Sequence, residues 1–485
     1  MSRSSRALIH RGTVVSAVRR APRALALACG WLALACGGSD GDDGNGGEPP
    51  APSIPDATTT MAEALGVAPE QLVATLLAAE GGAPLAGTRN LLVEDLGRTP
   101  AEVQEKLATA VNRFFGIGTG EPNQLIVDMG YRLYYELPQD KSQAFIWAAD
   151  SADIRSEGMS YGMMIAVQVG LREHFDRLWK FSRTHLQYAA GSGAWARYFK
   201  WQGRVNGSNA SSWPVTYAGD TVPAPDGDEY FAAALYLADR RWGSDGAVNY
   251  RAEADAIAQA MLDNTAAGMR FPLIHAQSNM VVFVPFGNSN NFSDPSYHLP
   301  AFYELYAEYA SEAHAERWRA IAEVSRAFFV SSAHPDTGLH PDYANFDGTP
   351  NAGGDRHDEF RYDAWRVVMN MAVDYAWGSE DARLKTQVEK YHAFFTNHIR
   401  PGNVANALFA IDGSGAEGGS STALTATLAS GALASEATNR NTYLQNVWEV
   451  GQQSGQFRYY QECVYLLGLL AAAGQYGHEW TPSGG

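Results

Sequence analysis

The chain has 485 residues, which is enough for one large domain or two of ordinary size. Its 53 acidic and 36 basic side chains give a formal net charge of -17, which argues against nucleic acid as a partner, because phosphates need a basic face. Hydrophobic residues make up 46% and charged residues 18%, a balance that indicates a globular protein with a sizeable core. A neutral ligand is more compatible with this net charge than a nucleic acid is.

The first 36 residues are typical of an export signal. Arginines and no acids lead into an apolar run from Ala24 to Cys36, which is too short to span a bilayer. The run ends in Leu-Ala-Leu-Ala-Cys and is followed by a Gly/Asp/Pro-rich stretch, so it resembles a bacterial lipoprotein signal with Cys36 as the lipidated residue. Cys29 has a similar context, and a plain secretory peptide is the other alternative. We expect an exported lipoprotein of the outer membrane, periplasmic or on the cell surface.

The rest of the chain divides into three parts. Residues 37–57 form a low-complexity tether, residues 58–87 an N-terminal extension, and residues 88–480 one folded domain. Cys463 is the single cysteine of the folded part, so no disulfide framework is expected. It lies in an apolar helical stretch, and we predict a buried thiol.

Hydrophobic spacing predicts a series of paired helices in the folded domain. Pairs have a short internal turn and are separated by long Gly/Pro/Asn/Asp loops. First members begin near Glu157, Asp228, His298 and Tyr362, with spacings of 71, 70 and 64 residues. The predicted helices cover 102–115, 157–170, 173–189, 228–241, 250–264, 298–311, 315–331, 361–377, 381–398, 421–435, 438–452 and 458–474.

Six such pairs would close into an all-α (α/α)6 barrel with a cleft at the N-terminal ends of the inner helices. An open solenoid would instead require a shorter repeat and shorter loops. Residues 280–287 are the one segment expected to form a strand.

Carboxyl groups occur at three of the predicted helix starts. Glu157 has Gly- and Met-rich surroundings that would raise its pKa, although a first-turn Glu can also merely complement the helix dipole. Asp226 stands close to Asp228 and Glu229, and one of these three acids is expected to be the N-cap; a calcium loop is another possibility. Asp363 precedes Arg366 by three residues, which would keep the Asp ionised or form a purely structural pair.

Four long motifs occur in order: SEGMSYGMMIAVQ, PAPDGDEYFAAALYLADRRWG, DPSYHLPAFYELYA and YDAWRVVMNMAVDY. Together they resemble glycoside hydrolase family 8, and within it the xylan-acting branch that includes reducing-end xylose-releasing exo-oligoxylanases. The resemblance covers roughly residues 88–478 and implies the (α/α)6 barrel. It also implies an inverting cleavage of β-1,4-xylosidic bonds in xylo-oligosaccharides or xylan by two carboxyl groups.

The resemblance assigns catalytic roles to matching positions. Glu157 in SEGMSYG matches the general acid, and Asp363 in YDAWR matches the general base that activates water. Asp226 in PDGDE matches the residue that holds the sugar before the cleavage point in a distorted ring.

The same resemblance assigns substrate-binding and supporting positions. Tyr297 matches a tyrosine that helps to position the attacking water. Tyr362 and Arg366 flank the base and would orient it, and Trp201 is a candidate stacking platform. No metal or organic cofactor is implied, so His298 and His357 are expected to be hydrogen-bonded scaffold or subsite residues. We expect a monomer.

The sequence departs from the family pattern in two places. Exo-acting members of the branch carry a loop with a His that blocks the cleft, whereas the corresponding stretch here, residues 412–430, contains no His. Without that His, endo cleavage or longer substrates become possible. Residues 204–220 are expanded and could reshape a subsite through Trp213 or Tyr217.

Two other functions remain open on the sequence. An endo-β-1,4-glucanase or a chitosanase of the same family would share the carboxyl groups, and an acidic cleft would suit cationic chitosan. A non-catalytic, lipid-anchored glycan-binding protein could lose either carboxyl, and the presence of both Glu157 and Asp363 counts against it.

Overall fold

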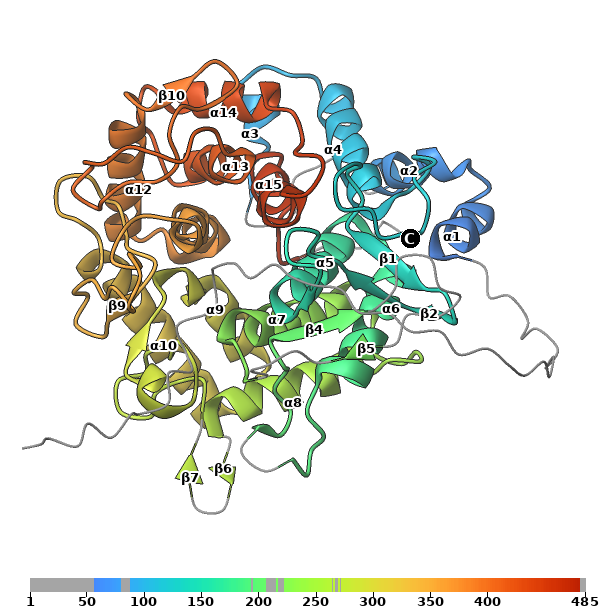
Figure 1. Cartoon of the computed structure of the whole chain (residues 1–485), viewed down its shortest axis with the longest axis horizontal. Coiled ribbons are helices and arrows are strands. Elements are labelled where there is room, and N and C mark those ends of the chain that lie inside the picture. Colours follow the sequence, from blue (N-terminus) through green and yellow to red (C-terminus); the bar gives the residue numbers. More distant parts are fainter. Residues whose placement is uncertain are drawn as a thin grey trace, which may run out of the picture.

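The computed structural model describes residues 56–79, 88–192, 195–205, 215–216, 222–263, 265–266, 269–270 and 272–479. Within these ranges the chain folds into a ring of helices (Figure 1). No helix among them is both long and apolar enough to cross a membrane. The predicted signal, Cys36 and most of the predicted tether lie outside the described residues.

Two concentric layers of helices build the ring. Six helices of the described chain form the inner layer: α5 (Ser156–Val169), α7 (Pro225–Trp242), α9 (Pro300–Tyr309), α11 (Val367–Asp374), α13 (Thr422–Ser430) and α15 (Arg458–Ala472). Each contacts the next, and α15 contacts α5. The outer layer consists of α4 (Pro100–Phe115), α6 (Arg172–Phe181), α8 (Tyr250–Asp263), α10 (Glu312–Ser331), α12 (Ala382–Phe395) and α14 (Arg440–Glu449). The predicted all-α (α/α)6 barrel is confirmed.

The two ends of the domain meet to close the barrel. Helix α4 lies against α15, although one begins the domain and the other ends it (Figure 1). Arg458, at the start of α15, is fully buried and donates hydrogen bonds to the carbonyl oxygens of Ile126, Val127 and Arg132 at 2.8–3.0 Å. The buried guanidinium therefore ties the last helix to the segment that follows α4.

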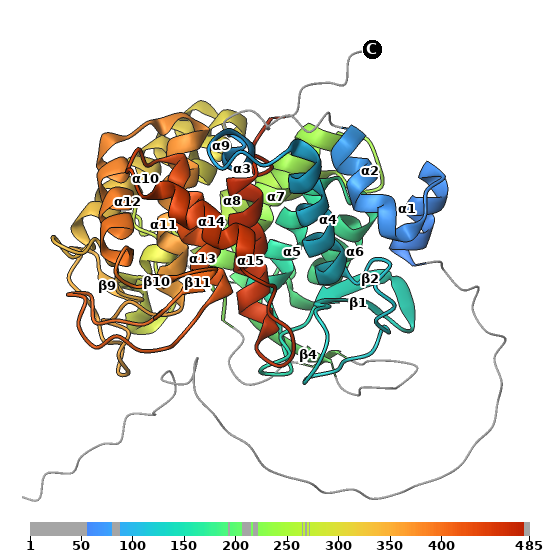
Figure 2. The same cartoon turned by 90° about the horizontal axis from the view of Figure 1, so that it is seen from above.

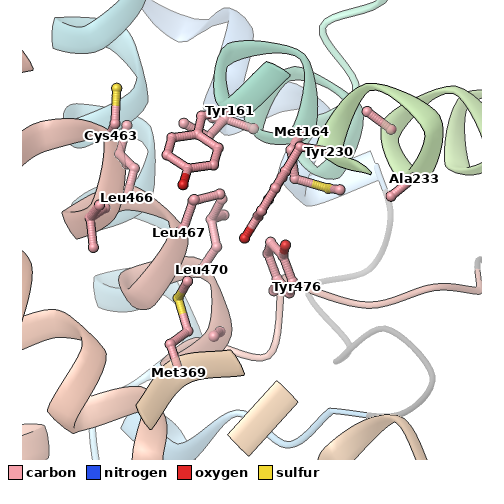
Figure 3. Packing of buried hydrophobic residues seen from close by; sticks show 14 of the residues in the cluster. Tyr161, Met164, Tyr230, Ala233, Met369, Cys463, Leu466, Leu467, Leu470 and Tyr476 are labelled. Atoms are coloured by element: carbon pink, nitrogen blue, oxygen red, sulfur yellow. The ribbon is translucent and has the colours of Figure 1, made fainter. Parts of the chain in front are cut away.

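The inner helices are buried on nearly all sides, as expected for helices in the centre of a large domain. All nine residues of α13 are buried, and in α5 Glu157 is the one residue that is not. Figure 3 shows their side chains meeting in the middle of the barrel, among them Tyr161, Tyr230 and Leu467. Cys463 belongs to this core as a buried free thiol, as predicted.

Small residues let the inner helices approach one another closely. A Cβ on Gly468 of α15 would lie 2.7 Å from the backbone of Ala426 in α13. A Cβ on Gly227 of α7 would lie 2.5 Å from Oγ of Ser156, the first residue of α5. At both contacts only a glycine fits without displacing the neighbouring helix.

Short strands lie in the segments that connect the helices. Those labelled in Figure 2, including β1, β2, β4, β9 and β10, gather at one end of it. All pairings are antiparallel: β1 (Tyr134–Leu137) with β2 (Asp140–Ile146), β4 (Gln202–Val205) with β3 (Ile154–Arg155) and β5 (Val215–Thr216), β6 (Thr265–Ala266) with β7 (Met269–Arg270), β8 (Phe292–Ser293) with β9 (Ala344–Asn345), and β10 (Ile399–Arg400) with β11 (Asn403–Val404).

Three shorter helices precede or flank the barrel: α1 (Ala57–Leu65), α2 (Leu72–Ala79) and α3 (Leu91–Glu94). Helix α1 contacts α6, and α2 contacts α4. Leu72, Val73 and Leu77 of α2 are buried in the main hydrophobic core. The predicted N-terminal extension thus contributes packed helices in its described part.

Three local predictions were wrong. Helix α7 begins at Pro225, and its N-cap is Ala224 with no side-chain cap, so none of the three nearby acids caps the helix. Proline at the first helical position has the backbone angle of a helix and needs no amide partner, which explains the earlier start. Residues 280–287 form no strand, only an isolated bridge between Val281 and Ile274. The segment predicted as one helix over 361–377 begins as a 3-10 turn, Asp363–Arg366, before α11.

Candidate active site

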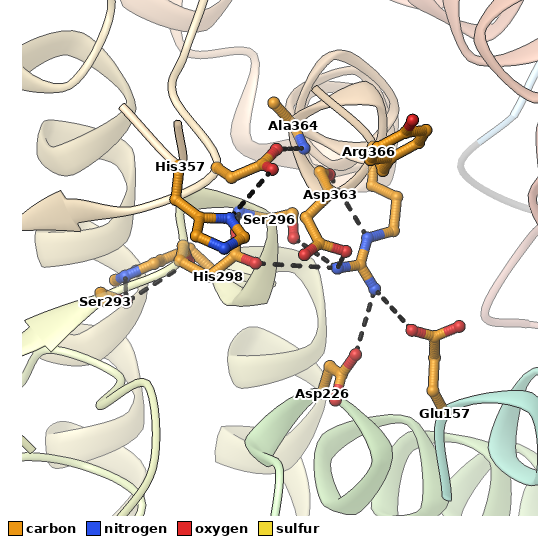
Figure 4. Close-up of polar contacts among 12 residues, drawn as sticks. Glu157, Asp226, Ser293, Ser296, His298, His357, Asp363, Ala364 and Arg366 are labelled. Carbon is orange, nitrogen blue, oxygen red and sulfur yellow. Dashed lines mark hydrogen bonds and ion pairs between the residues drawn. The ribbon is translucent and has the colours of Figure 1, made fainter. Parts of the chain in front are cut away.

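The predicted catalytic residues meet at the N-terminal ends of the inner helices. Glu157 lies in the first turn of α5 and Asp226 in the first turn of α7. Tyr297 ends a 3-10 turn that precedes α9, and Asp363 opens the 3-10 turn that precedes α11. Four separate segments therefore bring their polar side chains to one place (Figure 4).

Arg366 lies at the centre of the group, with 3% of its side chain exposed. Its Nη1 donates to Oη of Tyr161 at 2.6 Å and to Oδ2 of Asp226 at 3.1 Å. The same nitrogen lies 3.6 Å from Oε2 of Glu157. One terminal nitrogen of the guanidinium therefore faces two of the predicted catalytic carboxyl groups.

The other terminal nitrogen of Arg366 faces the third carboxyl. Nη2 donates to Oδ1 of Asp363 at 2.9 Å and to Oγ of Ser296 at 2.7 Å. It also lies 3.8 Å from Oδ2 of Asp294, a fully buried carboxyl. Arg366 thus stands between Glu157 and Asp363 and keeps them apart (Figure 4).

Glu157 is the carboxyl best suited to hold a proton near neutral pH. Burial raises its pKa to about 7, and the negative charges of Asp226 and Asp363 act in the same direction, while Arg366 opposes them. Only 17% of the side chain is exposed. A carboxyl with this pKa is protonated in a substantial fraction of molecules at pH 7 and can act as an acid.

Asp363 has a different environment. It is paired with the guanidinium of Arg366, and 28% of its side chain is exposed, so water can reach it. The amide of the next residue, Ala364, donates to Oδ1 of the buried Asp342 at 3.2 Å. That bond holds the turn that carries Asp363.

Asp226 is 3% exposed, and both of its carboxylate oxygens are engaged. Oδ1 accepts a hydrogen bond from the amide of Gly227 at 2.8 Å, and Oδ2 accepts the bond from Arg366. Burial raises the pKa of Asp226, and Arg366 lowers it.

The two neighbouring acids are fully buried and belong to the scaffold. Asp228 accepts a hydrogen bond from the amide of Phe199 at 3.2 Å, and Glu229 accepts one from the hydroxyl of Tyr303 at 2.8 Å. Burial raises the pKa of both well above the usual range. The described part of the chain contains no group of three or more His, Cys, Asp or Glu side chains arranged to hold a metal ion.

The predicted binding residues lie around this centre. Tyr297 is 8% exposed, with Cζ of Arg366 5.8 Å from the centroid of its ring. Tyr362 is 47% exposed beside Trp365, so its ring is accessible to a ligand. The carbonyl oxygen of the half-buried Trp201 accepts a hydrogen bond from the amide of Ser156 at 3.0 Å, which brings its backbone next to the start of α5.

The histidines have scaffold contacts. His298 is fully buried between Oγ of Ser293 and Oγ of Ser325, at 3.0 and 2.8 Å, and burial lowers its pKa to about 3, so it is neutral. Nδ1 of His357 lies 3.5 Å from Oδ2 of Asp342. Asp342 also accepts the hydrogen bond from Ala364, the residue that follows Asp363.

The loop of residues 412–430, which contains no histidine, forms ion pairs close to Asp363. Glu417 lies 2.5 Å from Nη2 of Arg356 and 3.4 Å from Nη1 of Arg361, two residues before Asp363. Its backbone pairs with that of Leu408. Trp213 and Tyr217, in the expanded segment, lie outside the described residues.

Several site residues were not singled out from the sequence. Ser296, Asp294 and Tyr161 lie inside the recognised motifs, so the signal was present but gave no reason to select them. Asp342 and Tyr459 lie in other segments and reach the site only through the tertiary fold.

Comparisons with known proteins identify the family of this chain. The family model of glycosyl hydrolases family 8 matches residues 146–474. The reducing-end xylose-releasing exo-oligoxylanase Rex8A of Paenibacillus barcinonensis is 37% identical over 353 residues, which cover 71% of this chain and 87% of that protein. A reducing end xylose-releasing exo-oligoxylanase of Halalkalibacterium halodurans is 34% identical over 401 residues, or 82% of this chain and 95% of that protein.

Solved structures give the same result. The crystal structure of a GH8 xylobiose complex from Teredinibacter turnerae superposes with a TM-score of 0.72 at 35% identity, covering 81% of this chain and 98% of that one. The structure of Rex8A complexed with xylose gives a TM-score of 0.71 at 33% identity, over 82% of this chain and 98% of that one. The chain therefore belongs to glycosyl hydrolases family 8 and is a glycosidase.

Proposed function

We propose that this glycosidase cleaves β-1,4-xylosidic bonds in xylo-oligosaccharides or xylan with inversion, using Glu157 as general acid and Asp363 as general base. One observation carries the assignment. Glu157 and Asp363 lie on opposite terminal nitrogens of the same guanidinium, one with a pKa raised to about 7 by burial and the other ion-paired and partly exposed.

The chemistry follows from that difference. Glu157 donates its proton to the glycosidic oxygen, so that the leaving sugar departs as a neutral alcohol. Asp363 takes a proton from a water molecule that attacks the anomeric carbon from the opposite face, which inverts its configuration. Inverting enzymes need carboxyl groups roughly 6.5–9.5 Å apart to hold this water, and the interposed Arg366 supports such a separation. Asp226 and Tyr297 would hold the sugar and the attacking water.

The names of the relatives support xylo-oligosaccharides as substrates. The three relatives at 33–37% identity are all named as reducing-end xylose-releasing exo-oligoxylanases. Relatives named as endoglucanases reach 26–29%. An endoglucanase or chitosanase, and a non-catalytic binding protein, are therefore not favoured.

The test is a product analysis with reduced and unreduced xylohexaose. The protein without residues 1–36 is incubated with each substrate, and NMR records product lengths and the anomeric form at first release. Release of α-anomeric products by the parent protein and none by Glu157→Ala or Asp363→Asn is the expected result.

The same experiment separates exo from endo action. Xylose released from the unreduced chain alone would show a reducing-end exo-enzyme despite the missing histidine. A spread from xylobiose to xylotetraose from both substrates would show endo action. Cleavage of cello- or chito-oligosaccharides with intact xylohexaose would contradict the proposed substrate.

We further propose that the enzyme is an exported monomer with a lipid on Cys36. The arginine-rich lead, the short apolar run and the Leu-Ala-Leu-Ala-Cys ending support this. Labelling with a radioactive fatty acid should be lost in Cys36→Ser and kept in Cys29→Ser, and the reverse would assign Cys29. Sedimentation velocity of the unlipidated protein tests the monomer.

A further inference from the structure

Tyr459 contacts the proposed general acid from the last inner helix. Its hydroxyl lies 3.3 Å from Oε1 of Glu157, in hydrogen-bonding geometry, and the residue is fully buried. Cζ of Arg155 lies 5.3 Å from the centroid of its ring. The four recognised motifs do not include this residue.

The backbone of α5 leaves a space for this contact. Gly158 follows Glu157, and a Cβ at this position would lie 2.6 Å from both Oη and Cε2 of Tyr459. Any side chain at 158 would therefore push the phenol away from the carboxyl group. The glycine and the tyrosine form a matched pair across the contact between α5 and α15.

We propose that Tyr459 is a positioning residue for the general acid: its hydroxyl binds Oε1 of Glu157 and leaves the transferable proton on Oε2. This inference rests on the proposed role of Glu157. The hydroxyl is the donor, because burial and the nearby carboxyl raise the pKa of Tyr459 well above its usual range and keep the phenol neutral. Oε2 is the oxygen that faces Arg366.

The arrangement suits the change of charge during the reaction. When the proton passes from Oε2 to the glycosidic oxygen, Glu157 becomes a carboxylate in a largely buried position. The Tyr459 hydroxyl on Oε1 and the Arg366 guanidinium near Oε2 both stabilise that charge, so the bond strengthens as the proton leaves. The hydrogen bond thus favours proton release as well as fixing the carboxyl group.

The test must leave the other charged and titratable groups around Glu157 unchanged. The charged and titratable neighbours of Glu157 are Arg155, Tyr161, Asp226, Asp363, Arg366, Tyr460 and Cys463. Tyr459→Phe substitutes none of these residues and keeps the ring that faces Arg155.

The test compares Tyr459→Phe with Tyr236→Phe. Tyr236 is equally buried, and its hydroxyl also donates to a carboxylate, Oδ1 of Asp255 at 2.9 Å, between α7 and α8. Both variants lose one part-buried tyrosine-to-carboxylate hydrogen bond, but only the first loses one to Glu157. The readouts are kcat/KM for xylotetraose over pH, and kcat/KM for 2,4-dinitrophenyl β-xylobioside, whose leaving group needs no proton.

In Tyr459→Phe we expect kcat/KM for xylotetraose to fall about tenfold and the rate on the dinitrophenyl substrate to change less than about twofold. A hydrogen bond to the ionised form lowers a pKa, so its loss should move the basic limb of the pH profile upward by about 0.5–1 unit. Tyr236→Phe should match the parent protein in both readouts. An unchanged pH profile with equal losses on both substrates would overturn the proposal.

A second variant covers the case in which Tyr459→Phe fails to fold. 3,5-Difluorotyrosine at position 459 keeps the hydroxyl and makes it a stronger donor, so the basic limb should move to lower pH. No downward shift would count against the proposal. Full activity of Glu157→Ala would instead refute the proposed function itself.

Discussion

Glu157 and Asp363 share one arginine but differ in their access to water. The side chain of Glu157 is 17% exposed and that of Asp363 28%, and only Asp363 makes a direct hydrogen bond to the guanidinium. Burial disfavours the charged form of a carboxyl, whereas a close cation favours it. Unequal desolvation and unequal distance from one charge therefore give two chemically similar groups different environments.

This difference predicts how activity depends on pH. Glu157, the proposed acid, must be protonated to act, and burial raises its pKa to about 7, so kcat/KM for xylo-oligosaccharides should decline as pH rises through about 7. A pH-rate profile of the parent protein measures this limb. A basic limb near the ordinary glutamate value of about 4 would contradict the assignment.

Replacing the central arginine should cost stability as well as activity. Arg366→Met leaves Glu157, Asp226 and Asp363 without their shared cation, and removing one partner of a buried pair costs about 3–5 kcal/mol. Loss of the cation should raise the pKa of Glu157 and Asp226 further. An acid whose pKa is raised in the folded state binds more protons there, so the unfolding free energy falls as pH rises.

Urea denaturation at pH 5 and pH 8 measures this effect. The deficit of Arg366→Met should be larger at pH 8 than at pH 5. Arg89→Met, which removes a half-exposed arginine from surface ion pairs, is the control and should cost less than about 1 kcal/mol at either pH. A deficit that is equal at both pH values would argue against buried, titrating carboxyl groups.

Whether a site residue can be predicted from the sequence depends on its position in the chain. Glu157, Asp226, Asp363 and Arg366 lie in recognisable motifs at helix starts, so pattern and resemblance were sufficient to select them. Tyr459 lies 302 residues from Glu157, and its contact depends on ring closure and on the space at Gly158. No local pattern carries that information.

At the scale of helices, hydrophobic spacing predicted the paired elements well but not where they begin. Pro225 starts α7 three residues before the first predicted position because proline itself fits the first turn. The turn at Asp363–Arg366 is tightened to a 3-10 geometry, with the amide of Ala364 bonded to Asp342 from another segment. Spacing reports the buried face of a helix and contains no information on such terminal bonds.

Close packing of inner helices predicts the effect of one added methyl group. Gly468→Ala would place a Cβ 2.7 Å from the Ala426 backbone, and such overpacking should lower the unfolding free energy by about 2 kcal/mol. Gly451→Ala is the matched control, because no atom lies within 4 Å of its added Cβ and its φ is not positive. Chemical denaturation of both variants checks this, and equal stabilities would show that α13 and α15 can move apart freely.

At the scale of the whole molecule, α1 and α2 extend the core beyond the barrel. Leu72, Val73 and Leu77 are buried, and each should contribute about 1.5–3 kcal/mol before the entropy of ordering the segment is subtracted. Removal of residues 1–87 should therefore lower Tm while kcat on xylotetraose stays within about twofold, because the hydrogen bonds and ion pairs of Glu157, Asp226 and Asp363 come from other described segments. Removal of residues 1–55 is the control, and equal Tm values for the two truncations would show that these helices add nothing.

The pairing of α4 with α15 has a consequence for biogenesis. Arg98 bonds to Gln445 across 347 positions, and Arg458 bonds to Ile126 across 332, so the ring can close only after α14 and α15 have been synthesised. Until α15 is present, the inner helices form an open arc of hairpins in place of a closed ring. Tyr459 lies in α15 too, so the surroundings of Glu157, the proposed proton donor, are complete only when α15 closes the ring.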